Sequence, residues 1–90
     1  MLPRFIVKDF VKKFIATEGQ KANVCIKHIL YGDQKINNCV LHPFVDEERI
    51  GLTINEEIIY ITMDELSSLN LDNAKYVITS KVMELHISIL

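Results

Sequence analysis

Apolar residues at the start of the chain recur at the three- and four-residue spacing of an α-helix. The apolar side of this segment consists of Ile6, Val7, Phe10, Val11, Phe14 and Ile15. Pro3 suits the first helical turn, and Gly19 suits the position just past the last turn. The pattern predicts a helix over residues 4–18 that packs on the rest of the domain. The alternative is a lysine-faced helix that lies on an anionic membrane.

From Ala22 onward the apolar spacing falls to two, which is typical of β-strands. The expected strands are Ala22–Tyr31, Ile36–Phe44, Arg49–Ile54, Ile58–Met63 and Lys75–Ile89, the last being one long bent strand or a hairpin broken near Ser80-Lys81. Gly32 and Asn55-Glu56-Glu57 predict tight turns, and Pro43 has to end or bulge its strand. Thr62 and Glu65 have the spacing of a capping box. This spacing predicts a helical turn through Leu66–Leu69, followed by a loop over Asn70–Ala74.

The chain is therefore predicted to be mainly β (α+β), with an N-terminal helix and a five- or six-stranded, strongly bent antiparallel sheet or small barrel. Ninety residues leave room for one core, and an apolar content of 49% argues against disorder. We expect residues 1–90 to form a single domain, with 4–18 as the helix and 22–90 as the sheet or barrel.

The order of the expected elements resembles a known family. Val24–Lys27, Tyr31–Asp33 and Asn37–Val40 follow one another as strand, glycine turn and strand, and Ile50–Ile54, Ile58–Met63 and Glu65–Leu69 complete the series. Over roughly residues 5–70 this order resembles the Sm-like small β-barrels, which include the bacterial Sm-type RNA chaperone. The resemblance implies an Sm- or SH3-like barrel and RNA binding. Thr62-Met63-Asp64 stand where the chaperone has its RNA-binding lysine–histidine pair.

Charge divides the chain into two halves within an overall net charge of −2. Residues 1–44 carry seven basic and three acidic residues, whereas residues 45–90 carry three basic and nine acidic ones. Packing between the halves, within one protomer or between protomers, is the favoured explanation. The alternative is a surface for RNA or single-stranded nucleic acid, formed by Lys8, Lys12, Lys13 and Lys27. Any anionic partner is expected to meet residues 4–35.

Two Cys-x₂-His pairs are the residues closest to site chemistry. Cys25, His28, Cys39 and His42 offer the four ligands of a zinc site. The intervening residues favour strands, in which residues i and i+3 point to opposite faces. If the strands form a hairpin about Asp33, Cys25 faces His42 and Cys39 faces His28. Ordinary strand residues are the favoured interpretation and zinc is the alternative, so no cofactor is expected.

Signals for catalysis and for membrane insertion are missing from the sequence. It has no glycine-rich phosphate loop, His-Glu-x-x-His motif or nucleophile elbow, and the paired carboxylates Glu47-Glu48, Glu56-Glu57 and Asp64-Glu65 fall in turns or caps. We expect no catalytic residue and no small-molecule substrate. No apolar run approaches the roughly 18 residues of a transmembrane span. Two cysteines without a signal sequence predict a cytoplasmic protein.

The end of the chain predicts self-association. The last strand carries apolar residues and no lysine or proline that would protect an exposed edge. The predicted oligomer interface consists of Met83, Leu85, Ile87 and Ile89. Because a domain of this size buries only a marginal core alone, we expect a small non-enzymatic interaction module. It would act as a self-associating adaptor or regulatory protein, with a second copy or another protein as its partner.

Overall fold

The computed structural model describes residues 4–90 and contains one helix and eight strands. The elements are α1 (Arg4–Ile15), β1 (Lys21–His28), β2 (Gly32–Val40), β3 (His42–Val45), β4 (Arg49–Ile54), β5 (Glu57–Thr62), a 3₁₀ turn (Met63–Glu65), β6 (Leu66–Asp72), β7 (Lys75–Ser80) and β8 (Met83–Ile89). The predicted N-terminal helix is confirmed, although it ends at Ile15, and Pro3 lies outside the described residues. Within residues 4–90 no helix is long and apolar enough to cross a membrane.

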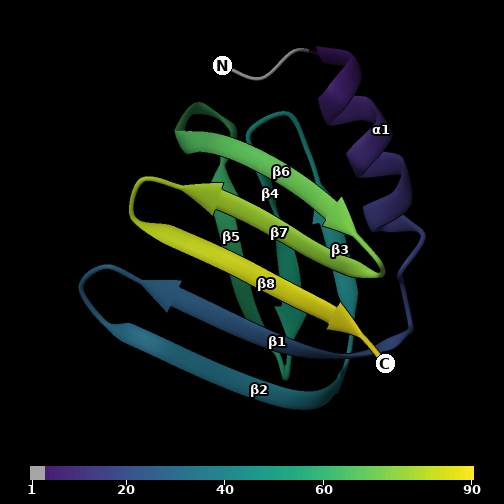
Figure 1. Ribbon diagram of the computed structural model, residues 1–90, viewed down its shortest axis with the longest axis vertical. Coiled ribbons are helices and arrows are strands. Elements are labelled where there is room, and N and C mark those ends of the chain that lie inside the picture. The colour runs from purple at the N-terminus through teal and green to yellow at the C-terminus, as the bar shows by residue number, and fades with distance from the viewer. Residues whose placement is uncertain (1–3) are drawn as a thin grey trace.

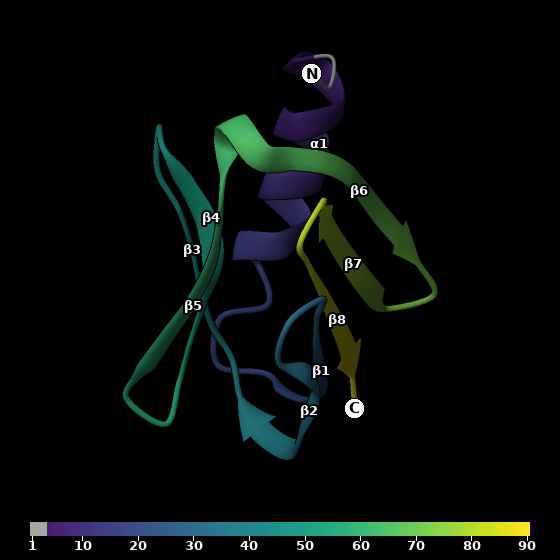
Figure 2. The same cartoon turned by 90° about the vertical axis from the view of Figure 1, so that its left-hand side faces the viewer.

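The strands form two antiparallel sheets that face each other (Figures 1 and 2). The larger sheet has the order β2-β1-β8-β7-β6, and the smaller one has the order β3-β4-β5. The mainly β architecture is confirmed, but there are eight strands rather than five or six. The hydrogen-bonded ladder is interrupted between β2 and β3 and between β5 and β6. The described residues therefore form two sheets and no closed barrel.

Helix α1 lies between the two sheets at one end of the molecule (Figure 2). Phe10 and Phe14 are buried there with their ring centroids 5.8 Å apart, and Tyr76 of β7 meets the Phe10 ring at 5.6 Å. The Tyr76 hydroxyl donates to the backbone oxygen of Lys13 at 3.2 Å. This cluster fixes the helix to the larger sheet through both apolar packing and a hydrogen bond. Ile15, expected on the same apolar side, is 41% exposed, so the buried stripe is narrower than predicted.

The end of the helix is tied to the corner at which the chain changes sheets. Gly19 has a φ of 82°, a left-handed conformation that favours glycine after a helix. Its N–H donates to the oxygen of Leu41, and the Leu41 N–H donates to the oxygen of Gln20, at 2.8 and 2.9 Å. Leu41 is fully buried between β2 and β3, so the strand breaks there and not at Pro43. Pro43 instead lies within β3, at the edge of the smaller sheet, where a missing N–H is tolerated.

Two-residue turns join β4 to β5 and β6 to β7. Asn55 and Glu56, and likewise Asn73 and Ala74, have positive φ at both central positions, as in the type I′ turns that suit twisted hairpins. The predicted turn after Ile54 is therefore confirmed. The break between β7 and β8 near Ser80-Lys81 is also confirmed.

Two predictions for the segment after β5 are wrong. The helical turn expected over Leu66–Leu69 is found at Met63–Glu65, and the Thr62 side chain does not cap it. Leu66–Asp72 is instead strand β6, which pairs with β7 and includes most of the predicted loop over Asn70–Ala74. Leu69 and Leu71 pack against the core from this strand. Pairing and core burial thus outweigh the weak strand preference of its serine and asparagine residues.

We expect Gly51→Ala to destabilise the protein strongly, because β5 leaves no room for a side chain at this position of β4. A Cβ at Gly51 would collide with the Ile59 backbone oxygen and lie 2.6 Å from the Tyr60 Cα. The free energy of unfolding, measured by urea denaturation, should fall by about 2 kcal/mol or more. Ser68→Ala on the exposed side of β6 is the control and should change it by less than about 0.5 kcal/mol. Equal midpoints for both variants would contradict the close approach.

Candidate functional site

The outer face of the larger sheet carries a cluster of polar functional groups. On β1, Ala22, Val24 and Ile26 are buried, so the residues that alternate with them point to solvent. On β8, Leu85 and Ile87 are buried in the same way. The outward residues of these two central strands are Asn23, Cys25, Lys27, Glu84, His86 and Ser88.

Strand register brings residues from four strands together on this face. Cys25 lies opposite Lys35 of β2 on one side and opposite His86 of β8 on the other. Further along the face, Ser88 lies opposite both Asn23 of β1 and Lys75 of β7. Residues that are up to 65 positions apart in the chain, such as Asn23 and Ser88, are therefore direct neighbours.

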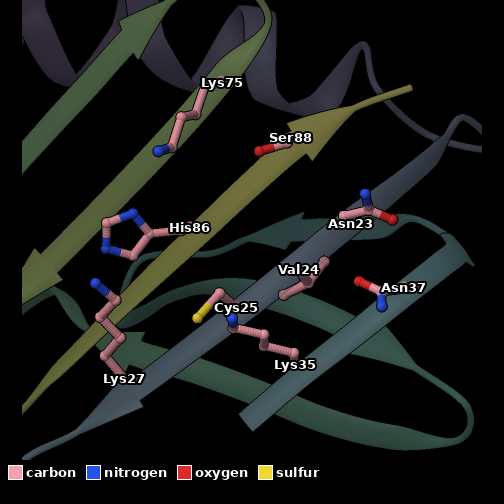
Figure 3. A pocket seen from close by; sticks show the side chains of 9 residues that line it. All are labelled: Asn23, Val24, Cys25, Lys27, Lys35, Asn37, Lys75, His86 and Ser88. Carbon is pink, nitrogen blue, oxygen red and sulfur yellow. The ribbon is translucent and has the colours of Figure 1, made fainter. Parts of the chain in front are cut away.

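These side chains surround a shallow hollow of about 290 Å³ (Figure 3). Lys27, Lys35 and Lys75 reach it from three strands, and His86 and Cys25 lie between them. The complete lining is Asn23, Val24, Cys25, Lys27, Lys35, Asn37, Lys75, His86 and Ser88. We call this surface the lysine hollow.

The residues that line the lysine hollow include three lysines and no carboxylate. None of its three lysines forms an ion pair with any described residue. The nearest acidic positions in the ladder are Asp33 and Glu84, opposite Lys27, and Asp72, opposite Lys75. Glu84 contacts His86, whose Nε2 lies 2.9 Å from Oε1 of Glu84. The hollow thus offers ammonium, amide and hydroxyl donors to a ligand that carries negative charge.

Cys25, His86 and Glu84 are arranged in the order of a thiol, an imidazole and a carboxylate, the groups of nucleophilic catalysis. Within residues 4–90, however, no hydrogen bond joins the Cys25 thiol to the His86 ring. The backbone around Cys25 pairs on both sides with β2 and β8, which occupies the N–H groups that would otherwise stabilise an oxyanion. Cys25 and His86 are therefore neighbours on this face without forming a hydrogen-bonded nucleophile–base pair.

The four candidate zinc ligands are not brought together. Cys25 lies on the outer face, whereas Cys39 is buried on the inner side, where its thiol donates to the Ala22 oxygen at 3.3 Å. His28 packs against Tyr31 at the β1–β2 turn, and His42 of β3 contacts Glu18. Across the described chain no group of three or more Cys, His, Asp or Glu side chains is placed to hold a metal ion.

The expected pairing of these residues is wrong in register. Cys25 lies opposite Lys35, not His42, and His28 lies opposite Gly32, not Cys39. The hairpin turns at Ile29–Tyr31 rather than about Asp33, because β2 already begins at Gly32. A bulge at Asn38, where φ is 53°, then places Cys39 opposite Ala22.

The four lysines predicted to bind nucleic acid do not share one surface. Lys8, Lys12 and Lys13 are exposed on α1, and Lys13 pairs with Asp9 at 3.3 Å. Lys27 lies near the end of β1, away from the helix (Figures 1 and 3). Lys35 and Lys75 were missed. The signal that could have found them is the two-residue alternation, which makes both outward residues of their strands.

The prediction that the last strand forms an exposed edge of the sheet is wrong. Strand β8 lies in the centre of the larger sheet, between β1 and β7, and all of its pairing is internal. Leu85 and Ile87 are fully buried, and Met83 and Ile89 pack against the same core. Apolar density at the end of the chain therefore reflects a central strand. The edges of this sheet are β2 and β6.

Comparison of the chain with protein-family models, with curated proteins and with solved structures found no match. No relative thus supplies an activity or a ligand for the lysine hollow. The chemistry of the hollow and of the strands beside it is the basis on which its function is inferred.

The two cysteines should differ sharply in reactivity. Burial raises the pKa of the Cys39 thiol, so this group stays protonated at neutral pH, whereas Cys25 is partly exposed in the lysine hollow. In the folded protein we expect a thiol reagent such as dithionitrobenzoate to modify Cys25 rapidly and Cys39 only on unfolding. Cys25→Ser should abolish the fast phase, and Cys39→Ser should leave it in place. A fast phase that survives in Cys25→Ser would contradict the assignment of faces.

Proposed function

We propose that the protein is a small non-enzymatic interaction module that binds an acidic segment of a partner protein in the lysine hollow. The observation that carries this proposal is the convergence of Lys27, Lys35 and Lys75, all unpaired among the described residues, on a hollow without a carboxylate. Three ammonium groups around one depression favour an anionic ligand and steer its approach. We place this activity in the cytoplasm, because both cysteines are free.

The free edge of β2 suits an extended ligand. Strand β2 is the outermost strand of the larger sheet, and its residues Lys35 and Asn37 form one wall of the hollow. An extended peptide can add to such an edge through backbone hydrogen bonds, and its alternate side chains then point to the same face of the sheet as Lys35. Acidic side chains at these positions would meet Lys35 first. Strand addition and charge thus support the same ligand.

A second copy of the chain is one source of such a segment. Asp46, Glu47 and Glu48 follow β3, and Glu56 and Glu57 lie at the β4–β5 turn, so acidic turns border the smaller sheet. The basic face of one protomer can therefore meet an acidic turn of the next. The proposed self-association relies on this charge complementarity and does not involve β8.

A second candidate function is the binding of single-stranded nucleic acid, which the Sm-like resemblance implies. The same three lysines favour it, since phosphate contacts supply most non-specific affinity. Sequence-tolerant binding of single strands also uses aromatic side chains on which bases stack. The outward residues of β1, β8 and β7 include His86 but no phenylalanine, tyrosine or tryptophan, because Tyr76 points into the core. We therefore rank an acidic peptide first.

Binding of a fluorescein-labelled glutamate-rich peptide, measured by anisotropy, tests the proposal. Exchanging Lys35 and Lys75 together for glutamate should weaken binding about tenfold or more, since two partly exposed charge contacts become repulsive. The control exchanges Lys8 and Lys12 of α1 for glutamate, which changes the net charge equally, and should alter affinity less than about twofold. Equal losses in both variants, or tighter binding of a thymidine oligonucleotide than of the peptide, would contradict an acidic-peptide site.

Sedimentation velocity tests the self-association. If the basic face meets acidic turns of a second copy, the oligomer should dissociate as salt is raised, because salt screens exposed ion pairs. The variant with glutamate at 35 and 75 should be monomeric at low salt. An oligomer that is indifferent to salt and to these exchanges would show that copies associate through another surface.

A further inference from the structure

Apart from Phe5, the three most exposed large apolar residues of the described chain lie together at one end of the larger sheet. Ile29, Leu30 and Tyr31 form the turn between β1 and β2 and are 72%, 78% and 84% exposed. Val82 of the β7–β8 turn, 43% exposed, lies beside them. We call these four residues the apolar tip. In Figure 1 both turns project from the side of the sheet opposite α1.

The apolar tip is held in place by specific hydrogen bonds. The Ile29 N–H donates to the Val82 oxygen at 2.9 Å, which joins the two turns. The Leu30 N–H donates to Nδ1 of His28 at 3.0 Å, and the His28 and Tyr31 rings pack with centroids 4.6 Å apart. The apolar exposure thus belongs to an ordered surface.

Ser80 organises the second turn in the same way. Its hydroxyl donates to the Met83 oxygen at 3.0 Å and accepts the Met83 N–H, also at 3.0 Å. Ser80 is buried, so this turn is anchored to the sheet and presents Val82 and Lys81 outward. A contiguous apolar surface on an ordered turn is typical of an interaction site, whereas single exposed apolar residues are common.

Basic residues flank the apolar tip. Lys27 and Lys81 line the small hollow between the two turns, which also contains His28. Glu84 lines the same hollow and Asp33 lies opposite Lys27, so the local charge is mixed, and apolar contact is the larger contribution. The tip combines aliphatic side chains, a tyrosine and nearby lysines, as do surfaces that enter the interfacial region of a bilayer.

We propose that the apolar tip docks this protein on an anionic membrane by inserting Ile29, Leu30 and Tyr31 into the interfacial region. Four apolar side chains on two narrow turns are too few to bury the roughly 800 Å² per partner of a stable protein interface. A bilayer needs no matching pocket and accepts a projecting tip. Lys27 and Lys81 then lie at the level of the anionic headgroups, where each adds a modest attraction.

The chain has no tryptophan, so a single introduced indole reports on the tip without background. With vesicles of phosphatidylcholine and phosphatidylserine, the emission of Tyr31→Trp should shift to the blue and be quenched by brominated lipid. Ile58→Trp is the matched control, because Ile58 is a 59% exposed apolar residue on the smaller sheet. Its emission should not change. An unshifted indole at position 31, or an equal shift at position 58, would overturn the proposal.

Vesicle co-sedimentation supplies the second test. Leu30→Asp should lower the partition coefficient about tenfold or more, since an inserted leucine is replaced by a charge. Ile58→Asp should leave it unchanged, and circular dichroism should show that both variants are folded. Loss of self-association in Leu30→Asp without any vesicle binding by the unmodified protein would assign the tip to a second copy and overturn membrane docking.

The membrane proposal, which goes beyond the acidic-peptide proposal, can be contradicted independently of it. Leu30→Asp should still bind the glutamate-rich peptide, because position 30 does not line the lysine hollow. The variant with glutamate at 35 and 75 should retain vesicle binding within about threefold, since neither position lines the hollow between the two turns of the apolar tip. Parallel loss of both activities in Leu30→Asp would overturn the assignment of the tip as a separate surface.

Discussion

Phe14 is packed between the two sheets, and both depend on it because neither sheet can bury its inner face alone. Phe10 and Tyr76 surround it, and the Tyr76 hydroxyl ties the helix backbone to β7. Replacing a buried phenylalanine with alanine typically lowers the free energy of unfolding by about 3–5 kcal/mol. The whole free energy of unfolding of a domain is only about 5–15 kcal/mol. Closure of the core by α1 is therefore a condition for the rest of the fold, including the outer surface of the larger sheet.

That closure also determines which residues remain free for binding. Once Val24, Ile26, Leu85 and Ile87 are fixed inward, the alternation of a strand leaves their neighbours outward. The antiparallel register then places Cys25, Lys35 and His86 side by side. Core packing thus determines where the lysine hollow lies. The absence of a carboxylate from its lining depends instead on which residues occupy the outward positions.

Local signals in the sequence were sufficient for the helix and for several hairpins. The spacing of Phe10 and Phe14 predicts the helix, and Asn55 predicts a turn. Both signals come from residues that are close together in the sequence, so they do not depend on strand pairing. Strand β6 could not be predicted in this way: Ser67, Ser68 and Asn70 have weak strand preference, and their pairing with β7 decides their conformation.

The candidate site was only partly predictable, for a related reason. Lys27 was identified from its own segment, but Lys75 joins it only through the β1–β8–β7 pairing, which the sequence does not specify. The same lack of pairing information made β8 look like an edge, since an apolar strand without lysine or proline fits the centre of a sheet equally well. The predicted Cys–His pairing failed because the hairpin turns at Ile29–Tyr31 rather than about Asp33, and the bulge at Asn38 then changes the face that Cys39 occupies.

Core formation does not account for Ile29, Leu30 and Tyr31. The connection between two strands of a hairpin needs turn residues. Asn55-Glu56 and Asn73-Ala74 show that this chain makes other turns from polar or small residues. Three large apolar side chains at the β1–β2 turn contribute little to folding, because they stay in solvent, and they raise the risk of aggregation. The hydrogen bonds from Ile29 and Leu30 nevertheless hold them in a defined position. A surface that is ordered, costly in water and unnecessary to the core is best explained by a contact outside the molecule.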